Sequence, residues 1–170
     1  MIADNTAVGQ IVCQLAMKPH PEGGYFREVY RSEAVVAGAS LPECFGGNAR
    51  SLSTAIYFLL ETGNFSAFHR IKSDELWHHY EGVSLEVVVI HPNGELEVLL
   101  VGKNLPMGER PLQVVPAGCW FASRVVADGY ALVGCTVSPG FDFADFELAN
   151  REALTARYPQ HAALIAELTR

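Results

Sequence analysis

The sequence has few charged residues, no basic excess and no long hydrophobic run. Only 18% of its 170 residues are charged, and 12 basic against 19 acidic residues give a net charge of −7. No segment approaches the roughly 20 apolar residues of a membrane-spanning helix. No basic stretch is present that would suit a nucleic acid or an anionic membrane. We therefore expect neither nucleic acid nor membrane as a partner.

Cysteine pairs and nucleotide-binding signatures are also missing. The four cysteines stand far apart, with no CxxC pair and no zinc-ligand spacing. They are expected to be buried, reduced thiols. The first ten residues carry no Lys or Arg, so no secretory signal is expected and the predicted location is the cytoplasm. Dinucleotide, P-loop and serine-hydrolase motifs are absent, and no cofactor is predicted.

What the sequence does contain is many short apolar runs separated by turns. It has 15 glycines and 9 prolines, and 49% of its residues are hydrophobic. Alternating or β-branched stretches predict strands. These stretches are residues 25–31, 51–60, 65–71, 75–81, 83–91, 95–101, 111–115, 120–126 and 130–137. So many short strands in hairpins predict one all-β domain, a barrel or a sandwich, over about residues 24–140.

Helical periodicity is confined to the two ends of the chain. Val8, Ile11, Val12 and Leu15 follow helical spacing after Thr6, a good N-cap residue, and predict a helix over about residues 6–16. A similar pattern predicts C-terminal helices over about residues 144–170. The whole chain, residues 1–170, is expected to form a single domain.

Titratable residues concentrate in the segment from His69 to Glu81, which holds three of the six histidines. Strand alternation counted from Glu75 places Trp77, His79 and Glu81 on the same face as Glu75. If that face lines a barrel, then a carboxylate, an indole and an imidazole project into the interior together.

The spacing of this segment resembles the first motif of the cupin superfamily, H-x-H-x(3,4)-E-x(6)-G. His69, Glu75 and Gly82 match it, whereas Ile71 stands at the second histidine. The segment 116–121 resembles the second motif, P-x-G-x-x-H, with Phe in place of its histidine.

A closer resemblance is to an uncharacterised cupin-like subfamily. Its blocks read here PHPEGGYFRE (19–28), STAIYFLL (53–60), HRIKSDELWHHYEG (69–82), VPAGCW (115–120) and GCTVSPGFDF (134–143). The resemblance covers about residues 17–147. It implies a double-stranded β-helix, the cupin jelly-roll barrel, with a ligand cavity inside and a homodimeric assembly. It implies no particular reaction, because a fold hosts many functions.

Three interpretations of His69 and Glu75 stay open. A full cupin metal site uses three histidines and one glutamate, so a metal would need His79 as a third ligand beside His69 and Glu75. Without a metal, His69 would be the acid/base group, supported by Glu75 and opposed by a tyrosine such as Tyr57. The third interpretation is two polar residues satisfied inside the barrel.

The N-terminal block from His20 to Arg27 predicts either a structural turn or a loop at the cavity mouth. A mouth loop would offer His20 and Glu22 to a ligand, with Tyr25 and Arg27 on the following strand. Alternation places Arg27 and Arg31 on one face, where guanidinium groups would suit an anionic ligand.

Three further aromatic features are expected near the cavity. Trp77 and Trp120 are assigned to the core or the cavity wall. The segment 138–143 is predicted to be either a rim lid with aromatic stacking or a packed connection over the barrel end.

Together these features predict a cupin that binds a small polar metabolite, such as a sugar or a sugar-nucleotide derivative. The chemistry considered first is metal-independent isomerisation or epimerisation. The alternatives are a non-catalytic binding or storage-type cupin and a metal-dependent enzyme with an incomplete ligand set.

Overall fold

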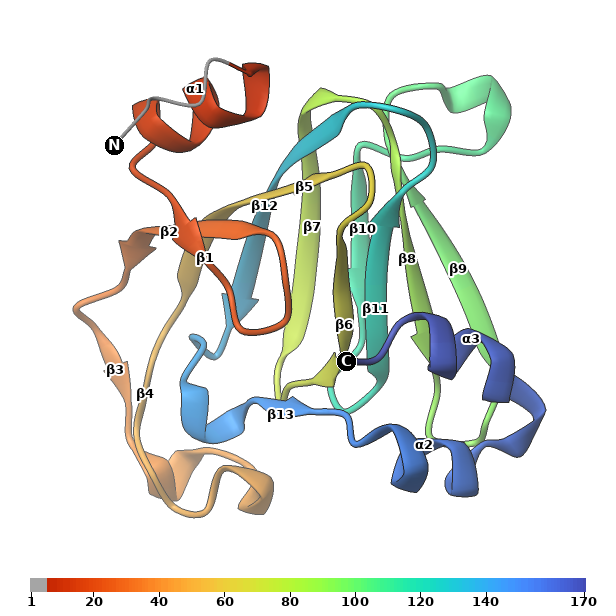
Figure 1. Ribbon diagram of the computed structural model, residues 1–170. Coiled ribbons are helices and arrows are strands. Elements are labelled where there is room, and N and C mark those ends of the chain that lie inside the picture. Colours follow the sequence, from red (N-terminus) through yellow and green to blue (C-terminus); the bar gives the residue numbers. More distant parts are fainter. Residues whose placement is uncertain (1–5) are drawn as a thin grey trace.

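Two antiparallel sheets face each other in the computed structural model, which describes residues 6–170 (Figure 1). The six-stranded sheet has the order β1 (Lys18–Pro19), β2 (Tyr25–Arg31), β5 (Thr54–Glu61), β12 (Tyr130–Ser138), β7 (Asp74–Gly82) and β10 (Leu112–Val115). The five-stranded sheet has the order β13 (Glu147–Leu148), β6 (Phe65–Arg70), β11 (Trp120–Val125), β8 (Leu85–Ile90) and β9 (Leu96–Val101). The predicted all-β double-stranded β-helix with short terminal helices is confirmed.

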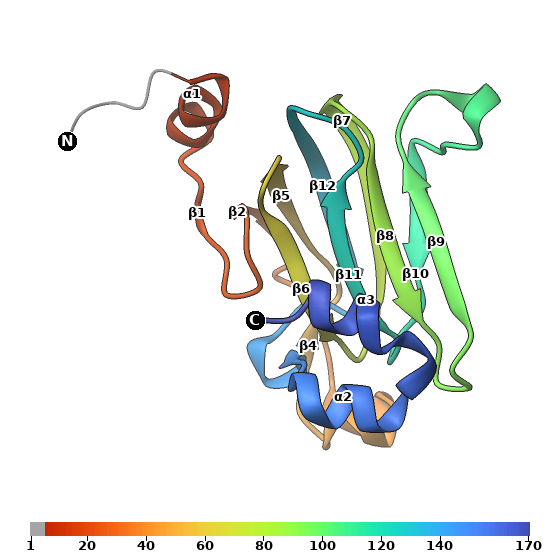
Figure 2. The ribbon, with the colours of Figure 1, turned by 45° about the vertical axis from the view of Figure 1, so that its right-hand side comes forward.

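The helices lie at the two ends of the chain, as the periodicity predicts. They are α1 (Ala7–Gln14), α2 (Arg151–Arg157) and α3 (Ala162–Glu167). Thr6 caps α1, because its hydroxyl oxygen accepts the N–H of Gly9 at 3.1 Å. Figure 2 shows α1 standing away from the sheets, whereas α2 and α3 lie across the outer face of the five-stranded sheet.

Short elements join the strands. A small ladder of β3 (Val35–Val36) and β4 (Arg50–Ser51) encloses the 3₁₀ turns Gly38–Ser40 and Glu43–Phe45. Further 3₁₀ turns are Leu105–Met107, Phe143–Asp145 and Pro159–His161. Within residues 6–170 no helix has the length and apolarity needed to cross a membrane. The expectation of no secretory signal rests partly on residues 1–5, which lie outside the described residues.

Side chains from both sheets fill the space between them. Trp77 is 1% exposed and packs edge to face against Phe58 and Phe121, with ring centroids 5.8 and 6.4 Å away. A second cluster, which includes Trp120, packs between the five-stranded sheet and the C-terminal helices. Apolar side chains therefore fill much of the space between the two sheets, and the buried polar side chains are gathered in a smaller part of it.

Alternation along β7 follows the prediction as far as His79. The prediction is wrong for Glu81, which is exposed, because the ladder with β12 shifts register between His79 and Glu81. Glu75, Trp77 and His79 are all buried, whereas Tyr80 is 46% exposed on the opposite face. The face predicted to carry a carboxylate, an indole and an imidazole is the inward one.

Strand β2 departs from the predicted alternation. Its ladder with β5 pairs Arg27 with Tyr57 but Arg31 with Thr54, because the register shifts between Glu28 and Tyr30. A β-bulge adds one residue to one strand and reverses the facing of the residues beyond it. The prediction that Arg27 and Arg31 share a face is therefore wrong: Arg31 turns toward the interior and Arg27 does not.

Candidate functional site

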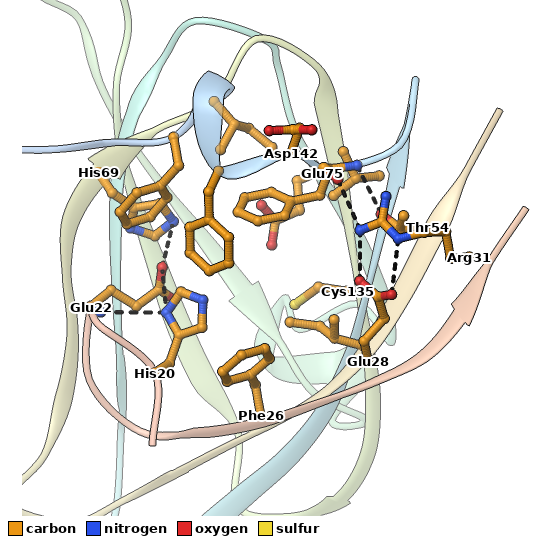
Figure 3. Close-up of a pocket in the computed structure, with 16 residues that line it drawn as sticks. His20, Glu22, Phe26, Glu28, Arg31, Thr54, His69, Glu75, Cys135 and Asp142 are labelled. Atoms are coloured by element: carbon orange, nitrogen blue, oxygen red, sulfur yellow. Dashed lines mark hydrogen bonds and ion pairs between the residues drawn. The ribbon is translucent and has the colours of Figure 1, made fainter. Parts of the chain in front are cut away.

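A cavity of about 240 Å³ lies among the N-terminal loop, the inner sheet faces and the segment that follows β12. Figure 3 shows the 16 side chains that line it. They are His20, Glu22, Phe26, Glu28, Arg31, Thr54, Ile56, His69, Ile71, Glu75, Cys135, Val137, Phe141, Asp142, Phe143 and Phe146. Half of these side chains are polar or charged, and they come from separate elements.

Glu22 lies at the centre of a buried hydrogen-bonded group. Its Oε1 accepts the hydroxyl of Ser66 at 2.9 Å. Its Oε2 lies 3.1 Å from Nε2 of His69 and 3.3 Å from Nδ1 of His20. The 21–24 turn carries this carboxyl inward, and the backbone approaches β6 so closely that a Cβ at Gly23 would lie 2.1 Å from the Phe65 carbonyl oxygen.

The hydrogen bonds determine where the protons of this group lie. Nδ1 of His69 is 2.8 Å from the carbonyl oxygen of Ala67, and a carbonyl only accepts, so Nδ1 carries the proton. In neutral His69, Nε2 is then an acceptor, and the proton between it and Glu22 belongs to the carboxyl group. Burial, with a further contribution from Glu75, raises the pKa of Glu22 well above its usual range. Burial lowers the pKa of His69 to about 3, so Glu22 is protonated and His69 is neutral.

His20 offers a free donor to the cavity. Its Nδ1 accepts the backbone N–H of Glu22 at 3.4 Å, so in the neutral ring Nε2 carries the proton. Burial, with help from the charge of Lys18, lowers the pKa of His20 to about 4, which keeps the ring neutral. Nε2 has no hydrogen-bond partner among the described residues, and the ring points into the cavity (Figure 3).

Glu75 is the second buried carboxyl of the cavity, and it has no cationic partner within the described part of the chain. It is 8% exposed, and its side-chain hydrogen bond is to the thiol of Cys135. Burial raises the pKa of Glu75 to about 7, although the Cys135 hydrogen bond opposes the rise. Burial likewise raises the pKa of Cys135, so the thiol keeps its proton.

The charged residues at the cavity mouth are already paired. Arg31 donates to Glu28 through Nε at 2.9 Å and through Nη2 at 2.7 Å. Its Nη2 also donates to the carbonyl oxygen of Phe141 at 3.1 Å. Bidentate pairing of this kind is the strongest arrangement available to a guanidinium group.

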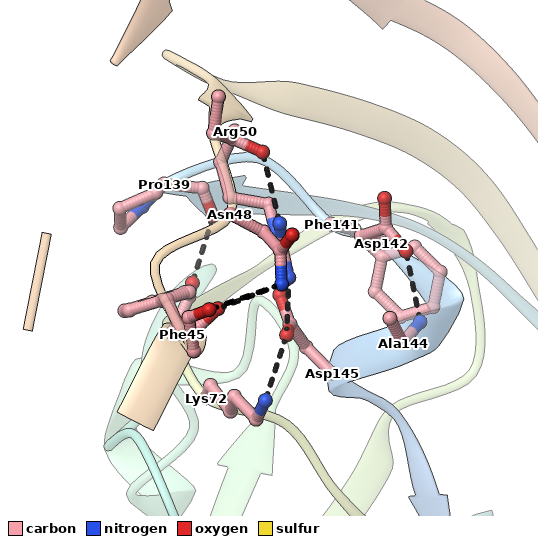
Figure 4. Close-up of polar contacts among 12 residues, drawn as sticks. Phe45, Asn48, Arg50, Lys72, Pro139, Phe141, Asp142, Ala144 and Asp145 are labelled. Carbon is pink, nitrogen blue, oxygen red and sulfur yellow. Dashed lines mark hydrogen bonds and ion pairs between the residues drawn. The ribbon is translucent and has the colours of Figure 1, made fainter. Parts of the chain in front are cut away.

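The segment 141–146, which covers one side of the cavity, is anchored by a buried ion pair. Asp145 accepts from Nε and Nη2 of Arg50 at 2.6 and 2.7 Å, and Nζ of Lys72 lies 3.1 Å away (Figure 4). The anchor holds three phenylalanine rings against the cavity, with centroids 5.0 to 6.2 Å apart. The segment is packed over the barrel end, as one of the two predictions for it states. Its aromatic rings also line the cavity, as the other prediction, a rim with aromatic stacking, states.

Of the residues singled out in the sequence, five meet in this cavity: His20, Glu22, Arg31, His69 and Glu75. Six others lie elsewhere. Tyr57 faces outward and packs on Tyr80, with ring centroids 6.1 Å apart, and Arg27 donates to the Ala16 carbonyl oxygen. Tyr25 lies near α1.

The two tryptophans and His79 are also outside the cavity. Trp77 belongs to the packed interior, and Trp120 lies under the guanidinium of Arg70, 4.6 Å from the ring centroid. His79 lies four residues beyond Glu75 on β7, about 13 Å along a strand. Its Nε2 is 3.0 Å from the Val83 carbonyl oxygen.

The metal-binding positions of the cupin motifs do not hold a ligand set here. Phe121 pairs with His69 across β11 and β6, its ring centroid 4.1 Å from that of His69, and Ile71 lines the cavity. Neither side chain can donate to a metal, and Nε2 of His69 faces the Glu22 carboxyl. In the described residues no three His, Cys, Asp or Glu side chains are grouped to hold a metal ion. The residues present therefore do not fit a cupin metal centre.

Several lining residues escaped the sequence analysis. Glu28 and Phe26 lie within a recognised block, but nothing in the sequence showed which face of β2 is inward. Cys135 lies on the inward face of β12, opposite Trp77. Phe146 lies in the stretch predicted to be helical, but it follows the 3₁₀ turn Phe143–Asp145, and α2 begins only at Arg151.

The fold and the site together define a member of the cupin class with a small interior cavity. The chain matches the model of the family described as Cupin superfamily (DUF985) over residues 9–149, and it belongs to that family. It is 30% identical, over 149 residues, to the uncharacterised protein YML079W of Saccharomyces cerevisiae, and the match covers 82% of this chain and 74% of that protein.

Solved structures support the same assignment. The protein SO0799 from Shewanella oneidensis is 46% identical, with a TM-score of 0.84 over 95% of this chain and 96% of that one. A hypothetical protein from Leishmania major is 39% identical, with a TM-score of 0.86 over 97% and 99%. Oxalate decarboxylase from Bacillus subtilis is similar at 19% identity and a TM-score of 0.53, over 88% of this chain and 36% of that one, which shows a shared fold only.

Proposed function

We propose that this protein binds a small polar metabolite containing a carbonyl group and isomerises it by proton transfer, without a metal ion. The observation that carries the proposal is the placement of two groups on one cavity. Glu75 is a buried carboxyl with no cationic partner in the described chain, and Nε2 of His20 is an unused donor.

Glu75 is the general base. A base works best when its pKa is near the working pH, and burial raises the pKa of Glu75 to about 7. His69, the acid/base residue favoured by the motif, is less suited. Both of its ring nitrogens face polar groups, and its pKa is lowered to about 3 by burial.

His20 is the electrophile. A neutral imidazole can donate a hydrogen bond to a carbonyl oxygen and stabilise the negative charge that forms there when a neighbouring carbon loses a proton. Glu22 and His69 are positioning residues. Glu22 lies beside Nδ1 of His20, and His69 orients Glu22.

The reaction needs no outside reactant. The Glu75 carboxylate removes a proton from the carbon beside the carbonyl, and the C–H electron pair forms the enolate. The enolate oxygen accepts a hydrogen bond from Nε2 of His20. If the enolate turns over in the cavity, Glu75 returns the proton to the opposite face of the same carbon, which yields the epimer. If the substrate carries a hydroxyl on that carbon, the hydroxyl proton passes to the enolate oxygen through an enediol. Glu75 then returns its proton to the adjacent carbon, which yields the isomer.

Hydrogen–deuterium exchange at carbon tests this function before the natural substrate is known. The purified protein is incubated in D₂O with glyceraldehyde, dihydroxyacetone and 2-hydroxycyclohexanone, and loss of the C–H signals is followed by NMR. We expect exchange of at least one compound, reduced 100-fold or more in Glu75→Gln. The control is Glu147→Gln, which alters an exposed ion pair. Equal exchange in the wild type and Glu75→Gln would support a non-catalytic binding protein instead.

We also propose a homodimer. The outer face of the six-stranded sheet exposes apolar side chains on neighbouring strands, with Tyr80, Leu112 and Val114 each 42 to 46% exposed. Exposed apolar patches of this kind are typical of protein interfaces. Light scattering after size-exclusion chromatography should give twice the chain mass for the wild type and a monomer for Leu112→Glu. A monomeric wild type would refute the assembly.

A further inference from the structure

We propose that the cavity selects an uncharged ligand about the size of one six-membered ring and rejects anions such as phosphorylated sugars and nucleotides. This inference rests on the proposed function because both concern the same cavity, but it does not depend on the isomerase reaction. It replaces the anionic ligand that the arginines of β2 first indicated.

No positive charge in the cavity is available to an anion. Among the lining residues within 6–170, Arg31 alone carries a permanent positive charge, and Glu28 holds it through two hydrogen bonds. The two lining histidines are neutral, because burial lowers the pKa of His20 to about 4 and that of His69 to about 3. A buried anion without a partner is strongly disfavoured, because its hydration is lost and nothing replaces it.

The carboxyl groups add to the rejection of anions. Glu75 lies inside the cavity, and Asp142 stands on its rim. A phosphate or carboxylate would meet these groups with no compensating cation. Glu22 keeps its proton and supplies no positive charge in their place.

Size and surface point to a single ring. The cavity volume of about 240 Å³ lies below the roughly 300–1,000 Å³ of pockets that enclose drug-sized ligands, so a nucleotide sugar cannot be enclosed. Phe26, Phe141, Phe143 and Phe146 supply aromatic surfaces for a flat, apolar body. The Nε2–H of His20 requires one acceptor oxygen on that body.

Two compounds of nearly equal shape test the charge selection, because benzamide is neutral and benzoate is an anion at pH 7. Affinities are measured by NMR titration of the isotopically labelled wild-type protein, up to 20 mM of each compound. We expect benzamide to bind at least 10-fold more tightly than benzoate. Benzoate binding as tightly as benzamide would overturn the inference, and so would the absence of binding by both.

A gain of function gives an independent test. Glu28→Gln removes the charge that holds Arg31, so the affinity for benzoate relative to benzamide should rise at least five-fold over that of the wild type. The matched control is Glu147→Gln, which releases Arg70 on the exposed surface and should change neither affinity. Unchanged benzoate binding in Glu28→Gln would show that Arg31 does not decide the selection. Benzamide binding without carbon exchange would refute the isomerase alone, whereas exchange with a preference for benzoate would refute the charge selection alone.

Discussion

Oε2 of Glu22 lies 3.1 Å from Nε2 of His69, so a carboxyl from the N-terminal loop faces the nitrogen that a cupin metal site would use. The other ring nitrogen donates to the Ala67 carbonyl oxygen at 2.8 Å. His69 therefore has no free nitrogen toward the cavity, and its motif position serves to hold Glu22.

The first prediction concerns the proton on Glu22. A glutamine has the shape of a protonated glutamate and can still donate to His69 and accept from Ser66. Glu22→Gln should therefore change the free energy of unfolding at pH 7 by less than about 1 kcal/mol, whereas Glu22→Ala should lower it by about 2–4 kcal/mol. Urea denaturation measures both. Equal losses in the two variants would show that Glu22 is ionised in the folded protein.

The second prediction concerns pH and Glu75. Its pKa rises from 4.5 in the unfolded chain to about 7 in the folded protein, so the folded state holds the proton more tightly. The stabilisation is complete below pH 4.5 and is lost as the pH rises through 7, about 3 kcal/mol in all. Wild-type unfolding free energy should fall by that amount between pH 4.5 and 8 relative to Glu75→Gln. Parallel pH profiles of the two proteins would contradict the assignment.

The third prediction compares two ion pairs of the same chemistry. Arg50 and Asp145 are 5 and 7% exposed, whereas Arg70 and Glu147 form an exposed pair. Asp145→Asn leaves a buried guanidinium without its partner and should cost about 3–5 kcal/mol. Glu147→Gln should cost less than about 1 kcal/mol. Amide hydrogen exchange at Phe141 should also increase in Asp145→Asn alone; unchanged exchange there would mean that the pair does not anchor the segment.

The fourth prediction concerns metal chelation. Ile71 and Phe121 occupy two ligand positions of the cupin motifs, and the residues that remain do not form a ligand set. Because a ligand that binds only the folded state raises the melting temperature, removal of a structural metal would lower it. Dialysis against EDTA should leave the melting temperature within about 1 °C of its original value. A fall of several degrees in the melting temperature, reversed by adding a divalent ion, would show that the folded protein holds a metal.

The strands and the family were predictable because their signals are local. Alternation along β7 correctly grouped Glu75, Trp77 and His79, since side chains alternate in a regular strand, but it misplaced Glu81, where the register with β12 shifts. Alternation shows which face of a strand a side chain lies on, but not how far along the barrel it lies. His79 shares the inward face with Glu75 but lies too far along the strand to reach the same cavity, so the proposed His69–Glu75–His79 set is not assembled.

The remaining site depends on long-range packing. Phe58 is buried and Tyr57 faces outward, but the alternation of β5 alone does not say which face is inward. Phe141 reaches the cavity because Arg50, 95 residues before Asp145, anchors its segment. Neither relationship leaves a periodic mark in the sequence.

The extra residue in β2 lets two residues three positions apart share the inward face of one strand. Glu28 and Arg31 pair with Ile56 and Thr54 of β5, and Val29 and Tyr30 between them are both exposed. In a regular strand residues three positions apart face opposite sides, so Arg31 would point away from Glu28 and from the cavity. The ion pair at the mouth therefore depends on a backbone irregularity as much as on the two charged side chains.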